Sequence, residues 1–346
     1  MSNQTRPHKL RIGFSFVDLA LGGAQAFLVQ LAQGLSERGH NLSYFLYARR
    51  DDPSHTSPAL LSPLQAIAKP VPRPQDLLSC DVIQLDGYHS LLRKLPYLLH
   101  LDRCVETFHS AYSVRRSGPV YASHRVAISR AVQAKLKLPA HLIYYGIDLP
   151  PVPPDRQRQF DVAILGRVHP VKGHLLFLQV SELLYRRRGH LQALILGGFP
   201  KAGPYQRQVE AEIVRLRTAG LEIHFTGDVS PDEVPAWLAQ VKILLVPSQS
   251  EGFGRMAMEA LASRTPVVAN PVGGLLEIIQ EGETGFFAHR DDPASFAGIA
   301  TRLLDDPNLR QRLGERGRLD VAERFSLAAM LDAYEGLYSN VANHHH

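Results

Sequence analysis

The stretch that decides the fold is Pro247-Ser-Gln-Ser-Glu251-Gly-Phe-Gly-Arg-Met-Ala-Met-Glu259. Directly before it, residues 242–246 form a short apolar run of the kind that fills a buried strand. Residues 255–264, rich in Ala, Met and Leu, are predicted as a helix. Glu251 therefore lies in the loop at the carboxyl end of the strand, and Glu259 lies more than one turn into the helix. Ligands of an open parallel sheet bind beyond the carboxyl ends of its strands, so the stretch predicts an α/β fold with two carboxylates at the binding edge.

Bulk composition bounds the class of protein. At 346 residues the chain is long for one hydrophobic core and favours two domains. The 45% hydrophobic and 21% charged contents are those of an ordinary globular protein. No apolar run approaches the roughly 18 to 20 residues of a membrane span, and the N-terminal residues lack the apolar core of a signal peptide. We therefore expect a cytoplasmic protein, with Cys80 and Cys104 as reduced thiols in its core.

The charge is distributed unevenly along the chain. Residues 1–150 contain 17 Lys and Arg against 10 Asp and Glu, a net +7, whereas the remainder has 21 against 23, a net −2. A basic N-terminal half is compatible with an anionic partner, either a membrane surface or a phosphate-bearing acceptor. Ordinary solvation of the surface is the alternative. The sequence has neither zinc-finger spacing nor a basic low-complexity tail, so no nucleic-acid partner is expected.

The N-terminal half opens with a strand, a glycine turn, a helix and a second strand. The strands are predicted over residues 10–17 and 41–47, and Gly22 and Gly23 begin the helix between them. This is the βαβ unit of a doubly wound sheet. The two glycines allow backbone N–H groups at the start of the helix to approach an anion. A dinucleotide site is disfavoured, because the pattern is not Gly-x-Gly-x-x-Gly.

A later predicted strand, residues 103–109, ends in His109. A histidine at the carboxyl end of a strand is placed to hydrogen-bond a ligand, although a hydrogen-bonded loop residue is the plainer interpretation. Arg115 and Arg116 follow, either to hold an acidic acceptor or as a solvated loop. Both interpretations stay open at this point.

The second half restarts the βα pattern after a proline-rich linker at residues 150–154. A strand is predicted over residues 160–166, and Arg167 and Lys172 lie in the glycine-framed loop that follows. Arg supplies a planar fork of donors and Lys a mobile point charge, which together suit a diphosphate. An exposed basic turn is the alternative. Three helical stretches are predicted from about Pro293 onward.

The Glu251-x7-Glu259 spacing, with Gly-Phe-Gly after the first Glu, resembles the motif of the retaining glycosyltransferases of family 4, among the group 1 glycosyl transferases. The match continues through residues 260–268 and 272–279 to Glu281-Gly-Glu-Thr-Gly-Phe286. The resemblance implies the GT-B fold, with two Rossmann-like, doubly wound parallel-sheet domains that face a cleft. It implies an acceptor-side domain at residues 1–150, a donor domain at 151–325, and a final helix at about 326–342 that packs back on the first domain.

The resemblance also implies roles for individual residues. Arg167 and Lys172 would neutralise the diphosphate leaving group, and His109, which matches a Thr-x-His of the family, would touch the sugar. Glu251 would hold sugar hydroxyls and Glu259 the ribose hydroxyls. Tyr145 stands where the family usually has Asn. The full set implied on the donor side is Gly22, Gly23, Gly166, Gly227, Val229, Phe253, Gly254, Arg255 and Glu259.

The function implied by the resemblance is the retaining transfer of a hexose or N-acetylhexosamine from a UDP-linked or similar nucleotide sugar. The acceptor would be a glycan, a glycolipid or a small molecule, as in polysaccharide or lipopolysaccharide biosynthesis. We expect no cofactor and no metal site, since the basic pair balances the diphosphate and no Asp-x-Asp suits a cation. A peripheral position on the inner face of the membrane is compatible with the basic half. The alternatives are another GT-B enzyme, such as a sugar-nucleotide epimerase, or a non-catalytic nucleotide-sugar binding module.

Overall fold

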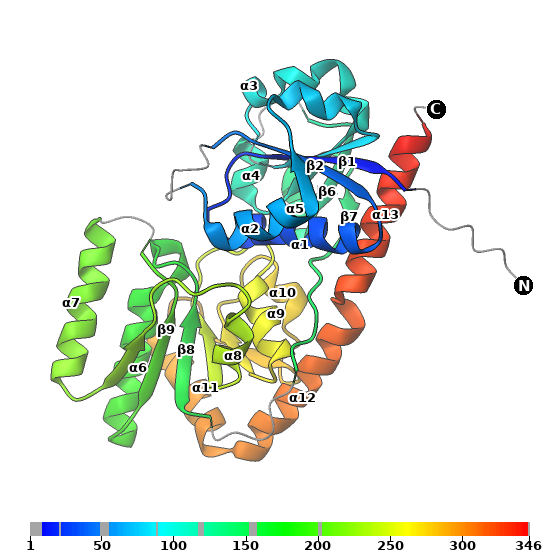
Figure 1. Ribbon diagram of the computed structural model, residues 1–346. Helices are drawn as coiled ribbons and strands as arrows, with labels where there is room; N and C mark the ends of the chain where they lie inside the picture. The colour runs from blue at the N-terminus through cyan, green and yellow to red at the C-terminus, as the bar shows by residue number, and fades with distance from the viewer. Residues whose placement is uncertain are drawn as a thin grey trace, which may run out of the picture. The chain divides into compact units, whose positions relative to one another are not determined.

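A computed structural model describes residues 9–20, 22–48, 55–87, 89–116, 121–151, 158–199 and 203–344. The chain folds into two units (Figure 1). Unit 1 consists of the chain up to Gly146 together with the segment from Leu327 onward, and unit 2 is Ile147–Ser326. The first division falls at Gly146, just before the expected linker, of which residues 152–154 lie outside the described residues.

Unit 1 contains a seven-stranded sheet in the order β3-β2-β1-β4-β5-β6-β7. Every neighbouring pair is parallel, and the order runs outward in both directions from β1 and β4. This is the doubly wound arrangement that the strand, glycine turn and helix pattern predicts. The strands are β1 Arg11–Phe16, β2 Asn41–Leu46, β3 Ala68–Pro70, β4 Val82–Asp86, β5 Cys104–Phe108, β6 His124–Ala127 and β7 His141–Leu142.

The helix α13 (Leu327–Asn343) belongs to unit 1 although it is far from the rest of that unit in sequence. Its buried Tyr334 and Tyr338 reach the sheet, where their hydroxyls pair with Thr107 Oγ1 at 3.0 Å and Gln84 Oε1 at 2.7 Å. Such hydrogen bonds remove the cost of burying a phenol oxygen. The other helices of the unit are α1 Gly23–Glu37, α2 Pro58–Ile67, η1 Pro74–Ser79, α3 Leu91–Lys94, η2 Leu95–Arg103, α4 Ala111–Arg116 and α5 Arg130–Leu136.

Unit 2 contains a six-stranded sheet in the order β10-β9-β8-β11-β12-β13, with every neighbouring pair parallel. Its strands are β8 Phe160–Leu165, β9 Gln192–Leu196, β10 Glu222–Phe225, β11 Val241–Val246, β12 Val267–Ala269 and β13 Gly285–Phe287. The helices are η3 Pro170–Lys172, α6 His174–Arg188, α7 Pro204–Thr218, α8 Val234–Leu238, α9 Arg255–Ala262, α10 Leu275–Ile278, α11 Pro293–Asp305 and α12 Pro307–Arg324.

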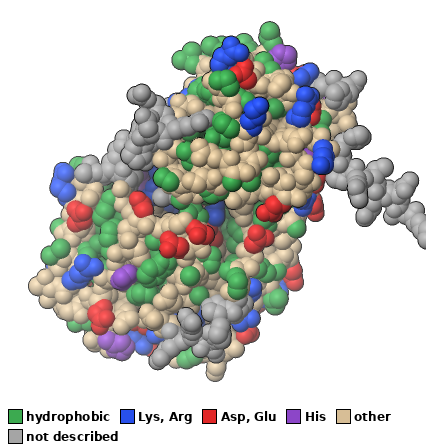
Figure 2. Space-filling view, in the orientation of Figure 1, with side chains coloured by type: hydrophobic (Ala, Val, Ile, Leu, Met, Phe, Trp, Pro, Cys, Tyr) green, Lys and Arg blue, Asp and Glu red, His purple; other side chains and the backbone are tan. Residues whose placement is uncertain are grey.

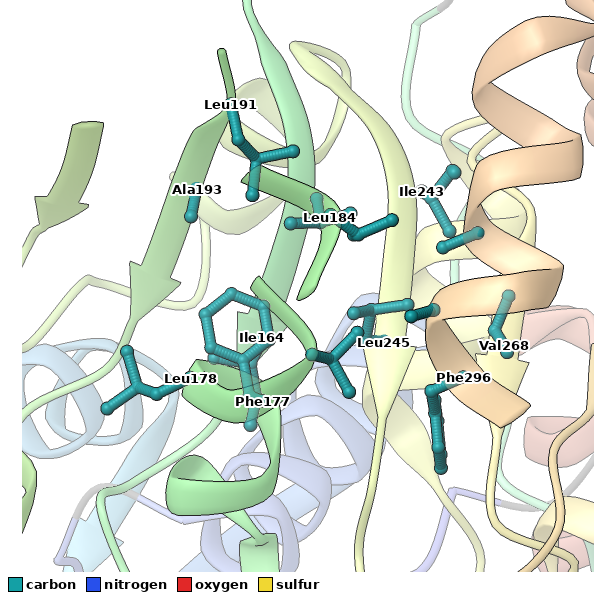
Figure 3. Packing of buried hydrophobic residues seen from close by; sticks show 14 of the residues in the cluster. Ile164, Phe177, Leu178, Leu184, Leu191, Ala193, Ile243, Leu245, Val268 and Phe296 are labelled. Carbon is teal, nitrogen blue, oxygen red and sulfur yellow. The ribbon is translucent and has the colours of Figure 1, made fainter. Parts of the chain in front are cut away.

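The core of unit 2 lies between its sheet and the helices α6 and α11. Figure 3 shows Ile164 and Leu245 from the strands among Phe177 of α6 and Phe296 of α11, all of them buried. The strands are apolar over nearly their whole length because helices cover both faces of a parallel sheet. This explains why apolar runs, rather than alternation, predicted them from the sequence.

Cys80 and Cys104 are buried and reduced, as predicted, and burial raises the pKa of both thiols. None of the helices in the described part of the chain has the length and apolar content to cross a membrane.

Gly314 in α12 and Gly298 in α11 offer a matched test of the packing in unit 2. A Cβ at Gly314 would lie closer than 3.0 Å to the carbonyl oxygen of Arg264, whereas nothing lies within 4 Å of a Cβ at Gly298. We expect G314A to lower the free energy of unfolding by about 1–3 kcal/mol, because backbone must shift. G298A should raise it by up to about 1 kcal/mol through helix propensity. Urea unfolding measures both, and effects of equal sign would contradict this packing.

Candidate functional site at the carboxyl edge of unit 2

The loops that follow β8, β9 and β10 are joined by backbone hydrogen bonds. The N–H of Gly166 donates to Leu196 at 2.8 Å, and the N–H of Gly197 donates to Gly227 at 3.1 Å. Gly197 has a φ of +131°, and a Cβ there would overlap the carbonyl oxygen of Gly166. A side chain at this position would therefore push the first two loops apart. The result is one continuous edge of backbone at the carboxyl ends of these strands.

The loop that carries Glu251 is fixed against the same edge. The N–H of Gln249 donates to the carbonyl of Val171 at 2.8 Å, and the N–H of Gly274 donates to the carbonyl of Glu251 at 3.3 Å. Gly273, at a φ of +55°, approaches Glu251 so closely that a Cβ would overlap its carbonyl oxygen. The Gly-Gly turn after β12 thus holds the backbone of Glu251 in place.

Lys172 and Glu251 form an ion pair across this edge. The distance from Lys172 Nζ to Glu251 Oε1 is 2.7 Å, and the side chains are 25% and 8% exposed. An ammonium has three donors, and Glu251 occupies one of them. Lys172 is therefore oriented by the carboxylate while it keeps donors for an anion. Arg167, exposed on the same loop, adds a second cation.

Glu259 is paired within its own helix. Arg255 Nε lies 2.7 Å from Glu259 Oε1, an i,i+4 pair on α9. A carboxylate has about four acceptor positions, so this contact leaves capacity for hydroxyl groups. Phe253, predicted from the resemblance as a donor contact, is buried and packs edge-on against Phe325 with ring centroids 5.5 Å apart. Its side chain therefore anchors the turn from inside unit 2.

Three residues of the implied donor set in unit 2 remain: Gly254 precedes α9 at a φ of +107°, and the other two lie in the loop after β10. Gly227 and Val229 are partly exposed there, beside the exposed Asp228. The Asp228 side chain accepts a hydrogen bond from the N–H of Gly198 at 3.2 Å. This loop is thus tied to the turn after β9 by a side chain as well as by backbone.

His174 is a residue of this edge that sequence reasoning missed. It is the first residue of α6, directly after Lys172-Gly173, and it is fully buried. Burial, with the nearby charge of Lys172, lowers the pKa of His174 to about 4. The imidazole is therefore neutral beneath a loop that already carries two cations. The only signal in the sequence was its position after the predicted basic loop, where a polar residue begins an apolar helix.

Unit 1 places His109 and the Gly22-Gly23 turn in one aromatic cluster. His109 is buried after β5, and its ring lies edge-on to Phe27 of α1 with centroids 5.2 Å apart. Burial lowers the pKa of His109 to about 4, so the ring is neutral near pH 7. Tyr145 packs on Phe27 with ring centroids 4.4 Å apart, and its hydroxyl donates to the carbonyl of Gly23. The sequence marked Tyr145 as a departure from the family pattern, but it did not reveal this contact with the glycine turn.

The basic residues of unit 1 are dispersed on the visible surface. Arg115 is exposed on α4, and Arg116 follows it in the same helix. On the face that Figure 2 shows, Lys and Arg side chains of the described residues stand in separate groups among apolar and acidic ones. The assignment of Arg115 and Arg116 to an acceptor stays a prediction.

The buried His174 generates a prediction about acid stability. Its folded-state pKa of about 4 lies below the ordinary 6.5, so the unfolded chain takes up the proton first. The resulting stability is complete above pH 6.5 and is lost as the pH falls toward 4; it amounts to about 3 kcal/mol. We expect H174Q to flatten the pH dependence of the free energy of unfolding over this window, measured by urea titrations. H190Q, which removes an exposed imidazole from the same unit, is the control. An unchanged slope in H174Q would contradict the assignment.

The comparison with known families and proteins concerns mainly unit 2. The family described as "Glycosyl transferases group 1" matches residues 149–320. A D-inositol 3-phosphate glycosyltransferase of Corynebacterium efficiens is 40% identical over 183 residues, which cover 51% of this chain and 42% of that protein. An alpha-D-kanosaminyltransferase of Streptomyces kanamyceticus is 28% identical over 197 residues, or 57% and 47% of the two chains. The matched part thus spans less than half the length of these relatives.

Solved structures establish the fold over nearly the whole chain. A glycosyltransferase of Rickettsia africae has a TM-score of 0.78 at 18% identity, with 96% of this chain and 99% of that chain covered. Anabaena HepE, solved in complex with UDP and glucose, has a TM-score of 0.79 at 19% identity, with 95% and 99% covered. The predicted GT-B fold is confirmed. Through residues 149–320, the chain belongs to the group 1 glycosyl transferases.

Proposed function

We propose that this protein transfers a hexosyl or N-acetylhexosaminyl group from a nucleotide diphosphate sugar, preferably linked to UDP, to a hydroxyl group of an acceptor. The observation that carries the proposal is the Lys172–Glu251 pair beside Arg167 at the carboxyl edge of unit 2. HepE, which shares the fold, was crystallised with UDP-glucose. The names of the two relatives describe transfer to an inositol phosphate and transfer of an amino sugar, in keeping with glycan, glycolipid or small-molecule acceptors.

Binding of the diphosphate follows from the charges at this edge. Arg167 presents a fork of donors, and Lys172 presents an ammonium that Glu251 already orients. Negative charge that builds up on the leaving phosphate then meets donors that need little rearrangement. Such preorganised electrostatic stabilisation is usually the largest single contribution to catalysis. The two cations thereby supply the positive charge that a bound divalent metal would otherwise supply. We propose that no metal or cofactor is required.

The two carboxylates of unit 2 and His109 of unit 1 suit the hydroxyl groups of the donor. Glu259 retains acceptor capacity for the ribose hydroxyls beyond its contact with Arg255, and Glu251 does so for the sugar. His109, neutral near pH 7, hydrogen-bonds a sugar hydroxyl without adding charge. Backbone N–H groups at Gly22 and Gly23 add neutral donors at the start of α1.

We propose that the transfer retains the anomeric configuration through a front-face reaction. Both carboxylates of the unit 2 edge are engaged with cations, which disfavours either as a nucleophile. The bond between the anomeric carbon and the phosphate oxygen breaks, and the acceptor oxygen bonds to that carbon on the same face. The acceptor proton passes to the leaving phosphate. Arg115 and Arg116 of α4 are proposed to hold an anionic acceptor.

Removal of either cation should impair turnover. We expect K172A and R167A each to lower kcat/KM by about 100-fold or more and to weaken UDP binding, because a charge-assisted contact to the diphosphate is lost. The measurements are UDP release from UDP-glucose or UDP-N-acetylglucosamine, and calorimetry with UDP. K242A is the matched control, since Lys242 Nζ also pairs with a carboxylate, Asp161 Oδ1, at 2.7 Å. Lys242 is the second residue of β11 and therefore lies at the opposite edge of the sheet. Near-normal turnover in both K172A and R167A would refute the diphosphate assignment.

Chelation of divalent metals should leave the activity intact. Because Arg167 and Lys172 balance the diphosphate, we expect UDP release in excess EDTA to match that in buffer alone within about twofold. The comparison is made on enzyme incubated with the chelator before the donor is added. A complete loss that Mg²⁺ or Mn²⁺ restores would show that a cation, rather than the basic pair, carries the charge.

A further inference from the structure

Five leucines of unit 1 stand exposed along α3 and η2. Between 41% and 89% of each is accessible, and they make up five of the eleven large apolar side chains that are exposed in the described part of the chain. Figure 2 shows apolar side chains gathered at the end of unit 1 where Figure 1 places α3, with basic, acidic and histidine side chains beside them. We call this set the leucine patch: Leu91, Leu92, Leu95, Leu98 and Leu99.

The segment is held with Lys94 and Tyr97 inward and the five leucines outward. Lys94 is fully buried, with its Nζ 2.8 Å from Glu106 Oε1 of β5. Tyr97 is fully buried as well, and its hydroxyl donates to Ser15 Oγ of β1 at 3.1 Å. Burial of an ammonium is costly, and it lowers the pKa of Lys94. The outward direction of the leucines is thus fixed by anchors in the core, opposite to the usual orientation of an amphipathic segment.

The stretch of sequence that contains the leucine patch has an excess of basic residues. Residues 87–101 contain no Asp or Glu. Residues 87–146 contain nine Lys and Arg against two acidic residues, Asp102 and Glu106, whereas residues 1–86 contain eight against seven. Lys94 and Glu106 neutralise each other inside the unit. Without this pair, residues 87–146 contain eight basic residues and one acidic residue. The positive excess of the N-terminal half is therefore concentrated in the part of the chain that carries the patch.

We propose that the leucine patch docks unit 1 onto an anionic lipid bilayer, with the leucines among the headgroups and the basic residues against the lipid phosphates. Apolar side chains flanked by Lys and Arg are the composition of interfacial segments, and each basic residue near an anionic surface adds to the attraction. A second copy would offer the basic residues of this segment no acidic partner from the same segment, because residues 87–101 contain no Asp or Glu. Docking through this patch is independent of the transfer reaction.

Sedimentation of the full-length protein with vesicles tests the proposal. On vesicles of phosphatidylglycerol and phosphatidylethanolamine at low salt, wild type should pellet. The partition coefficient of the L92S/L99S variant between vesicles and buffer should be lower by about tenfold or more. The matched control is L276S/L319S, which removes two leucines of unit 2 that are 55–56% exposed. This control should pellet like wild type. On phosphatidylcholine vesicles, wild type should bind more weakly, because the electrostatic attraction is absent.

Three outcomes would overturn the proposal. One is that wild type stays in the supernatant with anionic vesicles at low salt. Another is that the control variant loses as much binding as L92S/L99S. The third is that wild type elutes as a dimer and L92S/L99S as a monomer in gel filtration, without vesicle binding, which would make the patch a contact between copies. Circular dichroism shows that each variant is folded, so that lost binding reports on the surface itself.

Discussion

The ion pair between Lys172 and Glu251 connects two loops whose residues are 79 positions apart in the chain. A pair that is partly open to solvent adds little to stability, typically 0–1 kcal/mol. Its importance lies in geometry, because it aims the ammonium of Lys172 from a fixed backbone. That backbone is itself held by hydrogen bonds among the loops after β8, β9, β10, β11 and β12. The electrostatics of the site thus depend on glycines that let main chain approach main chain.

The same constraint accounts for the state of the buried histidine. Burial lowers the pKa of His174, and the charge of Lys172 lowers it further, because a protonated ring would be a third cation beside this loop. A neutral ring fills the space below the loop without electrostatic repulsion of the two cations on that loop. His109 in unit 1 is neutral for the same principal reason, burial. Both units therefore contain an imidazole that adds shape and hydrogen-bonding capacity but no charge at neutral pH.

The sequence predicted the fold wherever local chemistry determines it. Buried parallel strands read as apolar runs, and the Glu251 loop lies between two of them, so β11, α9 and β12 were foreseeable. Contacts between distant residues were not: the Lys172–Glu251 pair and the Tyr145–Gly23 contact depend on how separate loops meet. Hydrophobic periodicity fails to predict the buried face of α3 and η2 for a different reason. Its buried positions are a lysine and a tyrosine and its exposed ones are leucines, so a hydrophobic pattern points to the wrong face.

Unit 1 is assembled from two stretches of chain, and this affects the order in which the protein forms during synthesis. All of unit 2 leaves the ribosome as one continuous segment before α13 is made. Until α13 arrives, Gln84 and Thr107 lack their tyrosine partners, and Gly34 of α1 lacks the leucine that packs on it. Domains generally fold as units as they emerge, yet here the first to emerge is the last to be completed. A nascent chain would thus present an unfinished unit 1, with apolar surface for chaperones to cover, beside a unit 2 that is already folded.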